Sequence, residues 1–86
     1  MKKIEIIPIA KKKIKGRGIP EEMITDTLNS PMQIVDGYGG RSVAQRKLQI
    51  NEKEYLLRVV FEESDDTFFV ITAYLTSQID RYWKEE

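Results

Sequence analysis

Two apolar segments separated by an acidic turn dominate the pattern of hydrophobic and polar positions along the chain. Residues 55–61 place apolar side chains at both odd and even positions, which is typical of a central strand covered on both faces. Residues 67–74 are rich in the aromatic and β-branched side chains that strands favour. The acidic residues 63–66 between them are suited to a turn. The pattern therefore predicts two joined strands, the first of which is central in a sheet.

The N-terminal third predicts one strand and two helices. Residues 3–7 predict a short edge strand, and Lys3 with the preceding Lys2 discourages pairing with other chains. Pro8 can open a helix over residues 9–15, which Gly16 and Gly18 end. Pro20 opens a second helix, with two glutamates in its first turn where they complement the helix dipole.

The remaining segments predict two more strands and a last helix. Residues 32–36 and 41–50 are strand candidates, joined by a glycine-rich turn that lacks the spacing of a phosphate-binding loop. Thr76 or Ser77 caps a helix that contains Ile79, Tyr82 and Trp83, and Asp80 follows Ser77 at the spacing of a capping box. We write the element order as β-α-α-β-β-β-α, an α+β fold with consecutive antiparallel strands and helices packed on them.

Composition narrows the chemistry that the chain can perform. Its 86 residues suffice for one domain, 1–86, and they include no cysteine and no histidine. Disulfide chemistry and the commonest general base are therefore absent. The N-terminus lacks the apolar core of a signal peptide, and no apolar run approaches the ~20 residues that span a bilayer. We expect a cytoplasmic protein without a membrane partner.

Charge is distributed unevenly although the chain is neutral overall. Residues 1–17 carry seven Lys/Arg and one Glu, net +6, whereas residues 18–86 carry seven Lys/Arg and thirteen Asp/Glu, net −6. The dense cationic stretch consists of Lys11, Lys12, Lys13, Lys15 and Arg17. It suits a nucleic-acid backbone, because each phosphate contact releases counterions. The alternatives are an exposed helix face for the lysines and a structural role for Arg17 in the turn that follows.

Arg58 interrupts the most apolar strand candidate. A guanidinium at such a position is costly unless it is paired or opens onto a cleft. One interpretation is a cation that stabilises the negative charge of a phosphoryl-transfer transition state. The other is a structural ion pair with an acid such as Asp80.

Four short motifs in order carry a family resemblance over nearly the whole chain. They are Arg17-Gly18-Ile19, Leu57-Arg58-Val59, Thr72-Ala73-Tyr74 and Tyr82-Trp83. Together they resemble a family of small proteins of unassigned function within the RelE/ParE toxin superfamily, whose fold has the element order given above. That family opens its first helix with a His-Ala pair, and the corresponding residues here are Ile9 and Ala10. Chemistry that depends on that histidine is therefore not available to this chain.

The resemblance implies a toxin of a type II toxin–antitoxin system that acts as an endoribonuclease on messenger RNA at the ribosome. In this hypothesis Arg58 would hold the scissile phosphate, Arg46 or Arg81 would assist, and Tyr82 would transfer a proton or stack on a base. The 2′-hydroxyl of RNA is the nucleophile, so neither a metal nor another cofactor is expected. The implied partners are mRNA, the ribosome and a cognate antitoxin with an acidic segment that folds on binding.

Two alternatives stay open beside the ribonuclease. The chain is a non-catalytic nucleic-acid- or protein-binding module that kept the fold and lost the chemistry, as the zero net charge and Ile9 favour. The second alternative is a protein that poisons DNA gyrase, as ParE proteins do. Tyr82 is alternatively a packing residue beside Trp83, and Arg81 a solvated helix residue.

Overall fold

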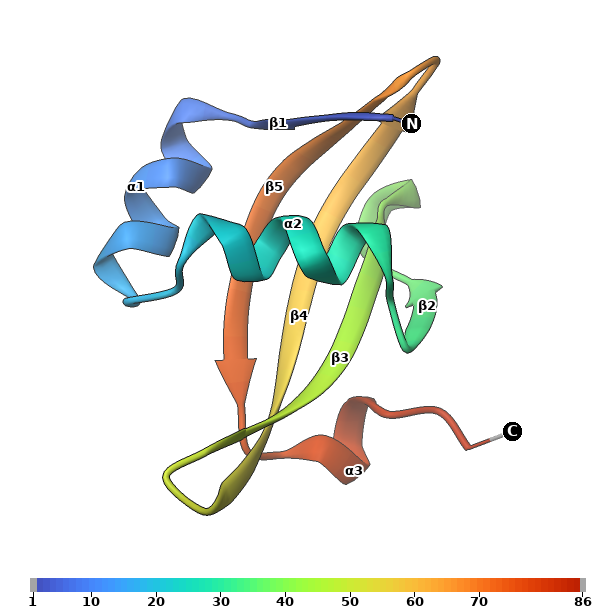
Figure 1. Cartoon of the computed structure of the whole chain (residues 1–86). Helices are drawn as coiled ribbons and strands as arrows, with labels where there is room; N and C mark the ends of the chain where they lie inside the picture. The colour runs from blue at the N-terminus through green and yellow to red at the C-terminus, as the bar shows by residue number, and fades with distance from the viewer. Residues whose placement is uncertain (1, 86) are drawn as a thin grey trace.

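A central strand, β4 (Lys53–Ser64), organises a five-stranded mixed sheet (Figure 1). The computed structural model describes residues 2–85. The strands β1 (Lys3–Ile6), β2 (Gln33–Asp36), β3 (Ser42–Ile50) and β5 (Thr67–Thr76) surround β4 in the order β1-β5-β4-β3-β2. This confirms that residues 55–61 belong to the middle strand and that β1 is an edge strand.

The sheet differs from the sequence prediction in two ways. All five predicted strand segments form strands, so the order β-α-α-β-β-β-α was one strand short. Strands β2 to β5 are antiparallel to their neighbours in the chain, as expected, but β1 is parallel to β5, with Lys3 opposite Thr67. A purely antiparallel sheet was therefore wrong. No hairpin joins β1 to β5, so their relative direction does not follow from a local turn.

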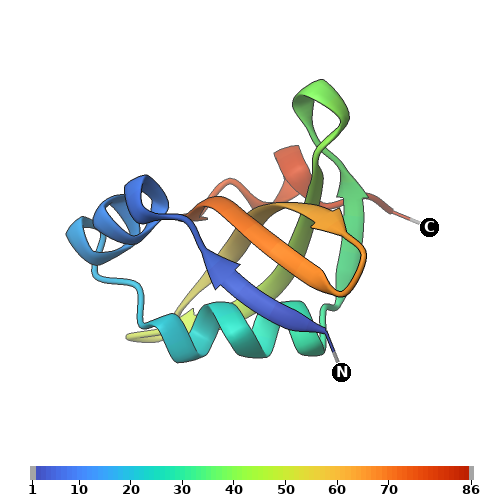
Figure 2. The ribbon, with the colours of Figure 1, turned by 90° about the horizontal axis from the view of Figure 1, so that it is seen from above.

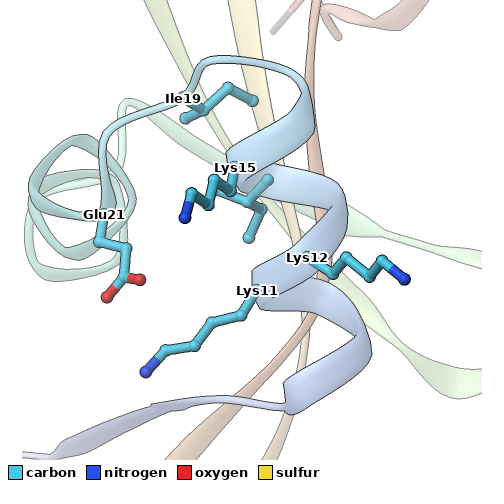
Figure 3. Close-up of a pocket in the computed structure, with 6 residues that line it drawn as sticks. Lys11, Lys12, Lys15, Ile19 and Glu21 are labelled. Carbon is cyan, nitrogen blue, oxygen red and sulfur yellow. The ribbon is translucent and has the colours of Figure 1, made fainter.

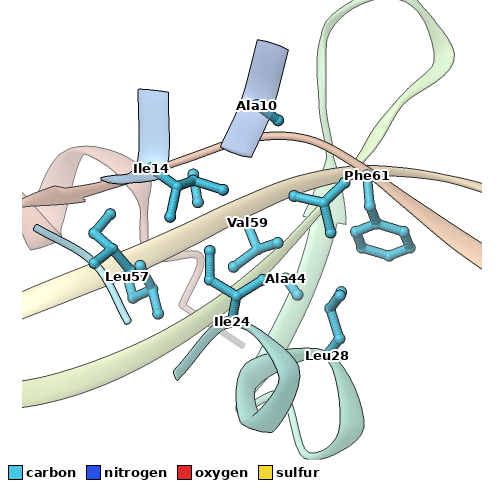
Figure 4. Packing of buried hydrophobic residues seen from close by; sticks show 11 residues of the cluster. Ala10, Ile14, Ile24, Leu28, Ala44, Leu57, Val59 and Phe61 are labelled. Carbon is cyan, nitrogen blue, oxygen red and sulfur yellow. The ribbon is translucent and has the colours of Figure 1, made fainter. Parts of the chain in front are cut away.

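Two helices cover one face of the sheet and form the main hydrophobic core. Helices α1 (Pro8–Gly16) and α2 (Glu21–Asn29) contribute Ala10, Ile14, Ile24 and Leu28, which pack with Ala44, Leu57, Val59 and Phe61 (Figure 4). The third helix, α3 (Ile79–Tyr82), lies on the side of the sheet opposite α2 (Figure 2). No helix within residues 2–85 has the length and apolar character needed to cross a membrane.

The turn between α1 and α2 has a specific hydrogen-bonding pattern that explains the Arg-Gly-Ile motif. Gly18 has a positive φ of 70°, its N–H donates to the carbonyl of Lys15, and the N–H of Ile19 donates to that of Ile14. This is a Schellman motif, which satisfies the last carbonyls of the helix. Ile14 and Ile19 are both buried beneath it. The predicted helix end at Gly18 is confirmed, and its glycine is required by the backbone conformation.

The last helix is shorter than the sequence suggested. It comprises a single turn, ends at Tyr82, and leaves Trp83 in an extended conformation. Its N-cap is Gln78, without a side-chain cap, so the predicted capping box of Ser77 and Asp80 is wrong. Thr76 instead accepts a hydrogen bond from the Gln78 N–H as the chain leaves β5.

Candidate functional site

Arg58 lies on the face of the sheet opposite α1 and α2. Its neighbours Leu57 and Val59 are in the helix-covered core, and side chains alternate along a strand. The residues opposite Arg58 on the adjacent strands are Gln45 of β3 and Tyr74 of β5. Paired residues project to the same face, so these three side chains form a row across the sheet.

Neutral groups hold the Arg58 guanidinium in place. Its Nε donates to Gln45 Oε1 at 2.7 Å, and its Nη1 donates to the hydroxyl of Tyr74. The Tyr82 ring stacks against it, with the guanidinium carbon 4.1 Å from the ring centroid. The Tyr74 and Tyr82 rings meet edge to face at 6.4 Å. Two hydrogen bonds and an aromatic face thus fix the direction of the fork.

Gln45 connects this group to the C-terminal segment. It is fully buried, and its amide nitrogen donates to Gln33 Oε1 at 2.9 Å and to the Tyr82 carbonyl at 3.3 Å. Gln33 also bonds the backbone of Lys84 in both directions, at 2.7 and 3.0 Å. The network therefore docks the segment that carries Tyr82 onto β2 and β3 and places its ring beside Arg58.

The positive charge of Arg58 has no acidic partner among residues 2–85. The salt bridges there join Lys2 to Glu63 and Arg41 to Glu62, so the predicted alternative of an Arg58–Asp80 pair is not formed. The Nη2 atom of Arg58 has no hydrogen-bond partner within residues 2–85. It is also not one of the buried polar atoms that lack a partner there. This nitrogen therefore keeps contact with solvent.

A pocket of about 340 Å³ opens beside Arg58. Arg58, Tyr74 and Tyr82 line it together with Val43 and Val60, which continue the same face of β3 and β4. Asp36 at the end of β2 and the loop residues Gly37, Tyr38 and Arg41 complete it. Its size lies at the low end of the range for small-ligand sites. A planar group with an attached anion fits such a combination of cation and aromatic rings.

The other predicted catalytic residues divide between the two faces. Arg81 is exposed on α3 next to the site, bonds Gln78 and lies 5.4 Å from the Tyr82 ring. Arg46 is opposite Leu57, so it projects to the helix-covered face, away from Arg58. The structure thus brings Arg58 and Tyr82 together, leaves Arg81 beside Tyr82 but outside the lining of the pocket, and separates Arg46 from them.

The predicted RNA-binding lysines are exposed along α1. Lys11, Lys12 and Lys15 line a second pocket of about 430 Å³ with Ile14, Ile19 and Glu21 (Figure 3). Lys11 and Lys15 point toward the Glu21 side of this pocket, whereas Lys12 points away from that side. Lys13 is exposed and does not line the pocket. No residue lines both this pocket and that of Arg58.

Arg17 has a structural role at the edge of the sheet. Its Nη1 donates to the Ala73 carbonyl at 2.9 Å and to Thr72 Oγ1 at 3.1 Å. Strand β1 pairs with β5 only as far as Val70, so Arg17 satisfies an edge carbonyl that no strand reaches. The side chain of Arg17 thus ties the end of α1 to β5, and not the turn between the two helices as the structural alternative had it.

Sequence reasoning missed Gln45 and Tyr38 as site residues and named Tyr74 only as part of the Thr72-Ala73-Tyr74 motif. A signal for Gln45 was present. A two-residue turn at Asn51 and Glu52 places Ile50 opposite Lys53 and fixes the register of the hairpin. Counting back along both strands from that pair sets Gln45 opposite Arg58. Tyr38 is a lone aromatic in a glycine-rich turn, and nothing local indicated that this turn lines a pocket.

Comparisons with protein-family models, curated proteins and solved structures found no match to this chain. The fold and the site together define a small α+β domain with a solvent-accessible cation at the wall of an aromatic pocket.

Proposed function

We propose that this protein is a toxin of a type II toxin–antitoxin system, a metal-independent endoribonuclease that acts on mRNA. One observation carries the proposal: Arg58 is held by neutral partners and keeps free donors at a pocket. A fixed guanidinium without a counter-ion is suited to bind a phosphate and to stabilise the charge that develops in the transition state. The motif resemblance to the RelE/ParE superfamily supports the same function.

The proposed reaction uses the RNA itself as the nucleophile. The 2′-oxygen attacks the adjacent phosphorus, and the bond from phosphorus to the 5′-oxygen of the next nucleotide breaks. The 2′-hydroxyl loses its proton, and the leaving 5′-oxygen gains one. The products are a 2′,3′-cyclic phosphate and a 5′-hydroxyl. Arg58 binds the non-bridging oxygens, and the hydroxyls of Tyr74 and Tyr82 are the available proton carriers.

Other cations extend the surface on which RNA lies. Arg81 is adjacent to Tyr82 and assists at the phosphate, whereas Arg46 has no role in this proposal because it projects to the other face. The exposed lysines of α1 contact phosphates farther along the strand, in a salt-dependent manner. An acidic antitoxin segment that folds on binding covers these cations before the toxin is released.

A second candidate function, a non-catalytic binding module, is favoured by one position. Ile9 is 61% exposed at the start of α1, where the resembled family has its histidine. A hydrophobic side chain there supplies no acid or base. If the family chemistry needs that group, the Arg58 pocket binds RNA without cleaving it.

Expression in growing bacteria separates the two functions. The toxin is expected to arrest growth and cut transcripts, and Arg58→Lys is expected to reduce cleavage about a hundredfold or more, because lysine keeps the charge but loses the fork. Gln45→Glu gives Arg58 an internal carboxylate partner and removes the donor to Gln33 and to the Tyr82 carbonyl, so it is expected to abolish cleavage as well. Lys53→Ala, a matched cation removal at the β3–β4 turn, is expected to retain activity.

The same variants need a check of folding and of target. Circular dichroism of each purified variant establishes that lost activity is not lost structure. Normal growth at high expression of the wild type, with intact transcripts, contradicts the toxin and favours the binding module. DNA-damage signalling without transcript loss instead indicates a gyrase poison.

A further inference from the structure

An aromatic residue without a partner lies at the entrance of the Arg58 pocket. Tyr38 is 97% exposed, the most exposed large hydrophobic side chain of the described residues, and it lines the pocket together with Arg58 and Tyr82. The loop that carries it, between β2 and β3, rises on the side of the sheet where α3 lies, opposite α2 (Figure 2). Tyr38 is therefore presented beside the pocket instead of being used in the core.

The loop is built to hold this position. A Cβ on Gly37 would meet the Arg41 carbonyl oxygen and a Val43 methyl group at 3.1 Å, and the Gly37 N–H donates to that carbonyl at 2.7 Å. Gly39 and Gly40 have φ values of 70° and 81°, which side chains rarely adopt. The backbone thus forms a tight turn around Tyr38. Within Gly37-Tyr38-Gly39-Gly40 the tyrosine is the one residue with a large side chain.

A free aromatic ring and a free guanidinium at one pocket match the two ends of a nucleotide. The guanidinium binds the phosphate, and an unpaired base stacks on an aromatic ring. In a duplex the bases already stack on one another and are closed to such a contact. The ligand class that fits is therefore single-stranded nucleic acid.

We propose that Tyr38 stacks on an unpaired base of single-stranded RNA whose neighbouring phosphate is bound by Arg58. The inference rests on the RNA-binding part of the proposed function but not on cleavage. It adds a residue that positions the strand, and it predicts binding that tolerates any base, because every base offers a face for stacking.

Binding of non-cleavable RNA tests this without relying on activity. Fluorescence anisotropy at fixed salt measures the affinity for a labelled ten-nucleotide 2′-O-methyl RNA, for the same sequence as a duplex, and for the same sequence as single-stranded DNA. Tyr38→Ala is expected to weaken binding of the single strand about 5- to 100-fold, whereas Tyr38→Phe retains it. Ile34→Ala is the matched control, because Ile34 is an exposed hydrophobic side chain of β2 outside the pocket.

A strand with one abasic position identifies stacking itself. When the abasic site occupies the stacked position, the wild type is expected to lose as much affinity as Tyr38→Ala does, and the two changes together add little more.

Equal affinity of wild type and Tyr38→Ala, alongside weakened binding by Arg58→Lys, overturns the role of Tyr38 and leaves the proposed function standing. Equal binding of duplex and single strand also overturns it. Tyr38-dependent binding without any cleavage of unmodified RNA supports the inference and contradicts the ribonuclease. If Tyr38→Ala weakens only the binding of a protein partner and leaves RNA affinity unchanged, Tyr38 belongs to a protein interface and the proposed stacking is overturned.

Discussion

Replacement of Gln45 by leucine removes the buried side chain that hydrogen-bonds Arg58, Gln33 and the Tyr82 carbonyl. Leucine has a similar volume and no polar atoms, so little cavity forms. The hydrogen bond from Arg58 Nε, at 2.7 Å, is lost with a charged donor and costs about 1.5–3 kcal/mol. The bond to Gln33 adds about 1 kcal/mol. We expect Gln45→Leu to lower the free energy of unfolding by about 2–4 kcal/mol.

Urea unfolding followed by circular dichroism measures this loss. Expressed as a melting temperature, it corresponds to a decrease of about 10 °C or more for a domain of this size. Trp83 is the only tryptophan of the sequence, and the Lys47 ammonium lies 4.3 Å from its ring centroid. Its fluorescence therefore reports whether the C-terminal segment detaches before the sheet unfolds.

Gln49→Leu is the control, because Gln49 is exposed on the same strand and is expected to change stability by less than about 0.5 kcal/mol. A Gln45→Leu protein as stable as the wild type would refute the reasoning. It would mean that the buried polar network contributes no net stability, as replacement of buried charged groups by apolar ones sometimes shows.

Two further predictions concern backbone conformation. Gly18→Ala is expected to lower the free energy of unfolding by about 1–2 kcal/mol, because the φ of 70° is unfavourable for alanine. Gly16→Ala inside α1 is expected to be neutral or stabilising by about 0.5–1 kcal/mol. Equal effects of the two substitutions in thermal unfolding would contradict the Schellman assignment. Glu52→Gly is expected to stabilise by about 1 kcal/mol, since Glu52 has a φ of 66° in the turn between β3 and β4, and Glu54→Gly in the adjoining strand is expected to destabilise. Loss of stability in both glycine variants of this hairpin would argue against a left-handed turn.

Much of the fold was predictable because its signals are local. The apolar positions at both parities of residues 55–61 indicated a central strand, and Gly18 marked the end of α1. These patterns depend on a residue and its near neighbours in the chain. The direction of β1 was not predictable in this way, because β1 meets β5 more than sixty residues later, with Lys3 opposite Thr67.

The sequence by itself determined that one arginine interrupts the most apolar strand, and that neither histidine nor cysteine is available near it. Beyond Gln45, which the β3–β4 turn places opposite Arg58, only the tertiary structure decided which residues surround that arginine. An irregularity between Val60 and Phe61 shifts the β4–β5 register by one residue, so that Arg58 faces Tyr74 and not Ala73. A one-residue shift exchanges the two faces of a strand, and this places the tyrosine hydroxyl, not a core alanine, beside the guanidinium. Register depends on pairing between distant segments, and for this reason the site was formed by the fold and not by any single stretch of the chain.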